Sequence, residues 1–186
     1  MTTSFVNLNR EHDPQVWVMD EHRVGLKPIL RRVWSLPGQR PVAPVEHRYE
    51  WLYVYGFVRP TTGRTFWLLM PTVSIVAFSI ALQHFMDFVD PLAQTAVRLL
   101  VDRAAYHTSA QVARPANLGR WFLPSHSPEL QPAEHLWELI DQPLLNRHFL
   151  DLEALQLTVA DQCCWLQDQP DLVRSTTNFH WWPQMA

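Results

Sequence analysis

Hydrophobic residues along this chain fall into runs with two different periods. Four runs are short and rich in β-branched or aromatic residues, as expected for strands; they lie at 16–19, 51–58, 65–70 and 97–101. A loop containing Pro60 and Gly63 joins the second and third runs, which predicts an antiparallel hairpin. Between 75 and 89, apolar residues recur every three or four positions, which predicts an amphipathic helix.

The second half of the chain continues this alternation. We expect a short helix near 109–112, a brief strand near 121–123, a helix opened by Pro132, and a last helix over 152–166. A hairpin followed by strands that alternate with helices predicts a mixed α/β protein. The stretch 65–86 has no formal charge, but prolines and polar residues interrupt it, so we expect no membrane span.

Composition narrows the class of protein. The chain has 186 residues, 47% of them hydrophobic and 18% charged, which favours one globular domain over 1–186 and excludes disorder. The two cysteines, Cys163 and Cys164, are adjacent and cannot form an ordinary disulfide framework. With no signal peptide at the start of the sequence, we expect a reducing, cytoplasmic location.

Positive charge is concentrated in one segment. Residues 23–64 carry eight bases and two acids, whereas residues 135–186 carry two bases and seven acids. Arginine-rich segments suit phosphate through the bidentate guanidinium, so this segment is a candidate for binding a polyanion. An ordinary solvated face is an equal alternative on charge alone.

Three acidic residues are candidates for metal ligands. Asp20 and Asp102 each end a predicted strand, and Glu134 lies in the first turn of a predicted helix, so the three could converge at one edge of the sheet. Hard divalent ions such as Mg²⁺ take oxygen ligands and can clamp the attacking and leaving oxygens of phosphoryl transfer. Taken singly, each acid is weak evidence, because such residues are common at strand ends and in first helical turns.

The residues around these acids carry more information. The segments are Val18-Met19-Asp20-Glu21, the Trp34 to Pro41 block, Leu99 to His107 with its Val101-Asp102 step, and Ser125 to Trp137 with its Ser-Pro-Glu-Leu-Gln-Pro-Ala-Glu run. Together they resemble the motifs of the DDE transposases of the mariner-like superfamily, specifically its bacterial insertion-sequence branch, the IS-six-thirty group. Arg103 stands where the family usually has Asn, Glu129 where Asp is commoner, and Gln131 where Asn is commoner. None of these departures removes a metal ligand.

The resemblance implies a fold and an activity. The fold would be ribonuclease-H-like, an α/β mixed sheet flanked by helices. Asp20, Asp102 and Glu134 would hold two Mg²⁺ or Mn²⁺ ions. The activity would be cleavage of transposon ends by water, followed by joining of the freed 3′-hydroxyl to target DNA. Double-stranded DNA would be the partner, a homodimer is a further expectation, and the location would be the bacterial cytoplasm in association with the nucleoid.

Recognition of a specific DNA sequence is expected to lie elsewhere. Family members carry helix-turn-helix domains before the catalytic domain, whereas the first acidic motif here falls within the first two dozen residues, so we expect that region to be absent and a DNA-binding partner chain to supply it. Residues expected to contact DNA are Arg23, Lys27, Arg31, Arg32, Arg40 and His107, although a structural role for His107 is equally plausible.

Other classes of function stay open or are excluded. A non-catalytic DNA-binding or oligomerising transposase remnant is the main alternative, and a ribonuclease-H-like repair nuclease is a weaker one. A zinc site is excluded, because the sequence has no paired Cys or His spacing of the zinc-finger or zincin kind.

Overall fold

The structure, a computed structural model, describes residues 15–39, 42, 48–125, 127–179 and 182. Its centre is a five-stranded sheet in the order β3-β2-β1-β4-β5. The strands are β1 (Gln15–Gly25), β2 (Trp51–Arg59), β3 (Arg64–Met70), β4 (Val97–Val101) and β5 (Leu118–Phe122). β1, β2 and β3 are antiparallel neighbours, while β4 and β5 run parallel to β1. The mixed sheet expected from the sequence is confirmed.

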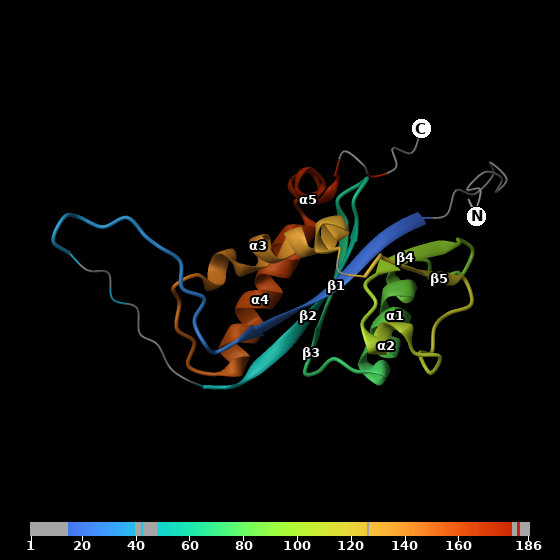
Figure 1. The fold of residues 1–186 in the computed structure, drawn as a ribbon, viewed down its shortest axis with the longest axis horizontal. Helices are drawn as coiled ribbons and strands as arrows, with labels where there is room; N and C mark the ends of the chain where they lie inside the picture. The colour runs from blue at the N-terminus through green and yellow to red at the C-terminus, as the bar shows by residue number, and fades with distance from the viewer. Residues whose placement is uncertain (1–14, 40–41, 43–47, 126, 180–181, 183–186) are drawn as a thin grey trace.

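Helices cover both faces of this sheet (Figure 1). One face packs against α1 (Ile75–Val89), and the other packs against α3 (Leu136–Asp141), α4 (Leu152–Gln167) and α5 (Pro170–Thr177). The side chains of Ser74 and Asp151 cap the N-termini of α1 and α4 by accepting hydrogen bonds from backbone N–H groups three residues later. The expected hairpin and the expected helices over 75–89 and 152–166 are therefore confirmed.

The alternation of side chains in β1 and β2 separates two hydrophobic cores. Trp17 and Met19 of β1 and Phe57 of β2 point to the α1 face, whereas Val18 of β1 and Val54 of β2 point to the face covered by α3, α4 and α5. All five are fully buried. A central strand with both faces covered accounts for the continuous apolar run at 16–19.

Several predicted elements differ from those observed. The short helix expected near 109–112 is instead α2 (Ala105–Thr108), directly after the loop that follows β4, and β5 starts three residues before the expected strand. The helix expected to begin at Pro132 begins as the 3-10 helix η2 (Pro132–His135) and becomes α-helical only at Leu136. Two further 3-10 helices, η1 (Pro128–Leu130) and η3 (Gln142–Leu144), and helix α5 were not predicted.

The largest correction concerns Asp20. It does not end a strand: β1 continues to Gly25, and each residue from Asp20 to Gly25 pairs with β2. The pairing of β1 with β4, however, stops at Val18 opposite Leu100. Asp20 therefore lies inside the strand but just beyond the point where β1 and β4 separate.

None of the helices in the described part of the chain is long and apolar enough to cross a membrane.

Candidate active site

The carboxylates of Asp20 and Asp102 lie where β1 and β4 separate. In the parallel register Val18 lies opposite Leu100, so continuing both chains by two residues brings Asp20 of β1 level with Asp102, the residue after β4. Residues two apart in a strand share a face, so Asp20 points to the same side as Val18, the side covered by α3. Sheet register alone thus places these two acids together at one edge.

Glu134 reaches this edge from the other direction. It belongs to η2, whose neighbouring residue Ala133 is fully buried against the sheet, while Glu134 itself is exposed. The side-chain amide of Gln131 donates a hydrogen bond to the backbone carbonyl of Met19 at 3.1 Å. This buried bond ties the start of η2 directly to β1, one residue before Asp20.

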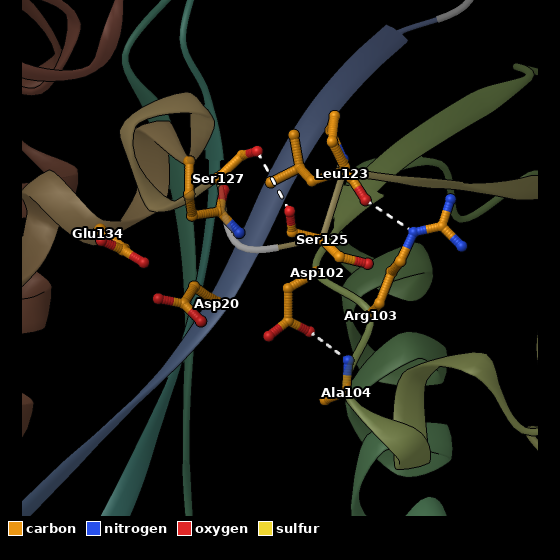
Figure 2. A pocket seen from close by; sticks show the side chains of 10 residues that line it. Asp20, Asp102, Arg103, Ala104, Leu123, Ser125, Ser127 and Glu134 are labelled. Carbon is orange, nitrogen blue, oxygen red and sulfur yellow. Dashed lines mark hydrogen bonds between the residues drawn. The ribbon is translucent and has the colours of Figure 1, made fainter.

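The three acids line one cavity of about 410 Å³. Figure 2 shows the carboxylate of Asp20 with Glu134 on one side and Asp102 on the other. The remaining wall is formed by Arg103, Ala104, Leu123, Pro124, Ser125, Ser127 and Gln131. The convergence expected from the sequence is therefore present in the structure.

Asp20 is held by a tryptophan. The indole N–H of Trp137 in α3 donates a hydrogen bond to Asp20 Oδ2 at 2.9 Å. The indole is itself stacked on the ring of His22, with centroids 5.0 Å apart and planes 12° from parallel. Burial raises the pKa of Asp20 to about 6, against the lowering effect of the Trp137 hydrogen bond, and the negative charges of Glu21 and Glu134 raise it further. The sequence marks Trp137 only as the last residue of a motif, and this contact was not predicted from it.

Asp102 is held by a histidine. His107 Nδ1 lies 2.5 Å from Asp102 Oδ1, and the backbone N–H of Ala104 donates to the same oxygen at 2.9 Å. The hydrogen bond from His107 lowers the pKa of Asp102, so this carboxylate is ionised at neutral pH. Asp102 Oδ2 accepts no hydrogen bond within the described residues and points toward Asp20 (Figure 2).

Glu134 has the least constrained carboxylate of the three. Desolvation and the negative charges of Asp102 and Glu129 raise its pKa, partly offset by His135. The negative charge of Glu134 raises the pKa of Asp20, and that of Asp102 raises the pKa of Glu134, so a bound cation would relieve this repulsion.

The donor set fits a hard divalent ion such as Mg²⁺ or Mn²⁺. All three groups are carboxylates, and both hydrogen bonds to Asp102 fall on Oδ1, which leaves its Oδ2 available to an ion. The described residues contain no group of three or more His, Cys, Asp or Glu side chains already gathered within ligating distance of a common ion. The arrangement is therefore an open acidic cavity, suited to an ion that keeps several waters.

The basic residues between 23 and 32 that are expected to contact DNA lie outside the acidic cavity. Arg23, Lys27, Arg31 and Arg32 are exposed, but none lines the acidic cavity. The segment with Arg31 and Arg32 extends away from the sheet beyond the C-terminal end of β1 (Figure 1). Arg40 lies outside the described residues.

The expectation of a DNA contact at His107 is wrong. Its side chain is fully buried, and both ring nitrogens face carboxylates, Asp102 on one side and Glu21 on the other. A ring with no exposed surface cannot meet a phosphate, so the alternative of a structural histidine is the one that the geometry supports.

Arg103 is a cavity residue that the sequence analysis noted only as a departure from the family pattern. Its Nε donates to the carbonyl of Leu123 at 2.9 Å, which fixes the side chain at the cavity wall. Its terminal nitrogens contact no acceptor in the described part of the chain, and Figure 2 shows the guanidinium directed away from the three carboxylates. Arg103 is the one basic side chain among the described residues that line the cavity.

Comparison with known proteins identifies the family. The family model described as DDE superfamily endonuclease matches residues 15–156, which include all three acids. An uncharacterized protein of Sinorhizobium fredii is 32% identical over 136 residues, covering 70% of this chain and 96% of that protein. The chain belongs to the DDE superfamily endonucleases.

Solved structures confirm the ribonuclease-H-like α/β fold. The catalytic domain of Mos1 mariner transposase matches with a TM-score of 0.53 at 15% identity, covering 90% of this chain and 84% of that domain. The Mos1 strand transfer complex matches with a TM-score of 0.59 at 15% identity. The Mos1 paired end complex with Mn matches with a TM-score of 0.59 at 17% identity. This chain spans 56% of the length of the transposase chain in each of these two complexes.

Proposed function

We propose that this chain is the catalytic domain of a transposase of the mariner-like superfamily, in its IS-six-thirty group. The observation that carries this proposal is the meeting of Asp20, Asp102 and Glu134 in one cavity, from a strand, a strand end and a 3-10 helix far apart in the sequence. In this proposal the three carboxylates are metal ligands. The family match and the fold of the Mos1 catalytic domain support the same assignment.

Two Mg²⁺ or Mn²⁺ ions would activate water and stabilise the attacking and leaving oxygens of a phosphodiester. The chain's own residues have defined tasks in this proposal. Trp137 holds one oxygen of Asp20, and Gln131 anchors η2 so that Glu134 faces the cavity. The proposed substrates are transposon ends and then target DNA. In support, the similar Mos1 transposase has been solved as a paired-end complex with the left transposon end and as a strand transfer complex.

The path of DNA across the surface would follow exposed arginines. Arg103 is placed to contact a phosphate at the cavity, because its fork is fixed by Leu123 while its terminal nitrogens stay free. Arg23, Lys27, Arg31 and Arg32 would contact the backbone farther from the reacting phosphate, and Arg40 is proposed from the sequence alone. A second copy of this chain and a separate DNA-binding chain are proposed partners, and the proposed location is the bacterial cytoplasm at the nucleoid.

A non-catalytic remnant is the second candidate. The observation in its favour is that the described residues hold no ready-made cluster of three ligating groups. Such a remnant would bind DNA through its exposed arginines and would show no dependence on divalent metal. The two candidates are therefore separated by metal binding.

The test is a titration of the 186-residue chain with Mg²⁺ or Mn²⁺, followed by cleavage of duplex DNA. We expect binding, and cleavage that requires the metal, with both lost in Asp20→Asn, Asp102→Asn and Glu134→Gln. Glu138→Gln is the matched control, because Glu138 is an exposed acid of α3 that does not line the cavity. Absence of metal binding in the unaltered chain would favour the remnant.

Phosphate contact by the exposed segment is tested separately. Replacing Arg31 and Arg32 together with Ala should lower affinity for unrelated duplexes about equally, because backbone contacts carry no sequence information. A loss confined to one sequence would contradict a backbone-contact role.

A further inference from the structure

Behind the acidic cavity lies a buried ion pair that the proposed metal ligands do not include. His107 Nε2 lies 2.9 Å from Glu21 Oε1, and the exposed fractions of the two side chains are 0% and 5%. The hydroxyl of Tyr106 donates to the other oxygen of Glu21 at 3.3 Å. The partners come from α2 and β1, 86 residues apart in the sequence.

The strand geometry of β1 explains why Glu21 is separate from the cavity. Asp20 and Glu21 are consecutive in β1, so their side chains point to opposite faces of the sheet. Asp20 enters the cavity beneath α3, while Glu21 lies on the face covered by α1, under the ring of His107. Asp20 thus places its carboxylate in the cavity, and Glu21 places its carboxylate on the opposite face of the sheet.

His107 connects the rear carboxylate back to the site. Its second nitrogen, Nδ1, lies 2.5 Å from Asp102 Oδ1, so one imidazole bridges Glu21 and Asp102. Both partners are carboxyl groups, so a protonated ring can donate from both nitrogens at once. Contacts with Phe78 and Tyr106, with centroids 4.5 and 4.4 Å away, fix the plane of the ring.

The bridge decides which oxygen of Asp102 is free. Asp102 follows the last residue of β4 and its side chain is 51% exposed, so sheet pairing does not restrain it. Both of its hydrogen bonds, from His107 and from the Ala104 N–H, fall on Oδ1. Oδ2 is left pointing toward Asp20 (Figure 2).

We propose that Glu21 is a positioning residue of this site, acting through His107 to hold the Asp102 carboxylate with Oδ2 presented to the metal. This inference rests on the proposed function, since it assigns Glu21 and His107 to the support of one of its ligands. A hydrophobic residue at position 21 would remove the group that His107 Nε2 contacts and would leave that buried nitrogen without its hydrogen-bond partner. Partners that orient a metal ligand in this way typically account for a 10- to 100-fold difference in metal affinity.

The experiment compares Glu21→Gln with the unaltered chain at fixed pH. Gln keeps one oxygen that can accept from His107 Nε2, but it removes the charge and replaces the oxygen that accepts from Tyr106 with an NH2 group. We expect Mn²⁺ affinity, measured by isothermal titration calorimetry, to fall about tenfold or more. Binding of duplex DNA in the presence of EDTA should be unchanged, because Glu21 does not reach the surface. Glu138→Gln, at an exposed acid of α3, is the matched control and should leave Mn²⁺ affinity unchanged.

Tyr106→Phe is the second variant, for the case in which Glu21→Gln does not fold. It removes only the hydroxyl that donates to Glu21 Oε2, so a smaller loss of Mn²⁺ affinity in the same direction is expected. The inference is overturned if a folded variant has a lower thermal stability without metal but the same Mn²⁺ affinity as the unaltered chain. Glu21 would then have only a structural role. Absence of Mn²⁺ binding by the unaltered chain would overturn the proposed function and this inference together.

Discussion

Gly56 of β2 lies directly opposite Asp20 of β1, and the missing Cβ of Gly56 is what admits the tryptophan that holds Asp20. A Cβ built at Gly56 would lie 2.8 Å from the indole of Trp137 and 2.8 Å from the indole of Trp67. Trp137 in turn donates its N–H to Asp20 Oδ2. The lack of a side chain at Gly56 in β2 therefore leaves room for Trp137 to hold the Asp20 carboxylate in β1.

Gly56→Ala is expected to displace Trp137 and Trp67. Overpacking of this kind costs about 1–3 kcal/mol in free energy of unfolding, and it should also weaken Mn²⁺ binding because the Asp20 contact is disturbed. Urea unfolding and Mn²⁺ titration measure the two effects. Gly119→Ala is the control, because a Cβ there would meet only the flexible side chain of Arg98. Equal and small effects at both glycines would show that Trp137 does not depend on this space.

Trp137→Phe should weaken Mn²⁺ binding at the site more than it lowers the stability of the fold. Phe retains an aromatic ring against His22 but has no N–H for Asp20, so a hydrogen bond to a charged group worth about 1.5–3 kcal/mol is lost. We expect weaker Mn²⁺ binding and a further rise in the pKa of Asp20, since the Trp137 bond lowers it. Trp67→Phe is matched to it, because the Trp67 indole donates to Thr65 and not to a proposed metal ligand. The prediction fails if the two variants bind Mn²⁺ equally well.

Asp20→Asn is expected to stabilise the metal-free chain at neutral pH. The pKa of Asp20 is about 6 in the folded chain against an ordinary value of 3.8, so the folded state binds the proton more tightly than the unfolded state does. The free energy of unfolding therefore falls as pH rises between these two values and is lowest, for this group, above them. Asn is neutral at every pH and still accepts from Trp137, so the gain at pH 7.5 should reach up to about 3 kcal/mol and vanish near pH 4.

Unfolding in urea with EDTA at several pH values measures this difference. Added Mn²⁺ should reverse the order, because a ligand that binds only the folded state stabilises the unaltered chain and not the variant. A variant less stable than the unaltered chain at pH 7.5 without metal would contradict the burial argument for Asp20.

Arg103→Ala is expected to weaken DNA binding regardless of sequence. Loss of one phosphate contact should reduce the slope of log affinity against log salt by about one. Fluorescence anisotropy with two unrelated duplexes over a range of NaCl concentrations provides the measurement. Arg174→Ala, at an exposed arginine of α5 paired with Asp171, should change neither affinity nor slope. An unchanged slope in Arg103→Ala would exclude a phosphate contact.

Cleavage by the 186-residue chain is expected to be weak and without preference for an inverted repeat. Reading base edges requires an element that enters a groove, but α1, α4 and α5 each bury side chains in the two cores. Metal ligands and backbone contacts position a phosphodiester without choosing a sequence. Comparing a repeat-bearing duplex with a scrambled one, with Mg²⁺ or Mn²⁺ present, tests this expectation. Clear selectivity would show that recognition lies within this chain.

Much of the fold follows from local pattern. The hairpin and β4 were predicted from short apolar runs rich in β-branched and aromatic residues, and α1 from apolar residues every three or four positions; α4 was predicted as well. The continuation of β1 was not predictable in this way. Asp20 to Arg23 is a polar run typical of a strand end, and it stays in the strand because Glu21 pairs with His107, a partner distant in the sequence.

The candidate active site, like the continuation of β1, could be predicted only in part from the sequence. The three acids could be proposed from their positions and from the family motifs, but the groups that orient them depend on contacts across the fold. The hydrogen bond from Trp137 to Asp20, for example, joins residues 117 positions apart. One available signal was Gly56, since an isolated glycine inside an apolar strand marks a place where another group approaches closely.

The three carboxylates differ in how firmly the backbone holds them. Asp20 lies within the β1–β2 ladder, with paired residues on both sides, whereas Asp102 follows the end of β4 and Glu134 sits in a single 3-10 turn. Moving Asp20 would break sheet hydrogen bonds, while small shifts of Asp102 or Glu134 would break none in the sheet. If the proposed function is correct, adjustment to the size of an ion would therefore fall on Asp102 and Glu134. Asp20 would be the ligand that the backbone keeps in place.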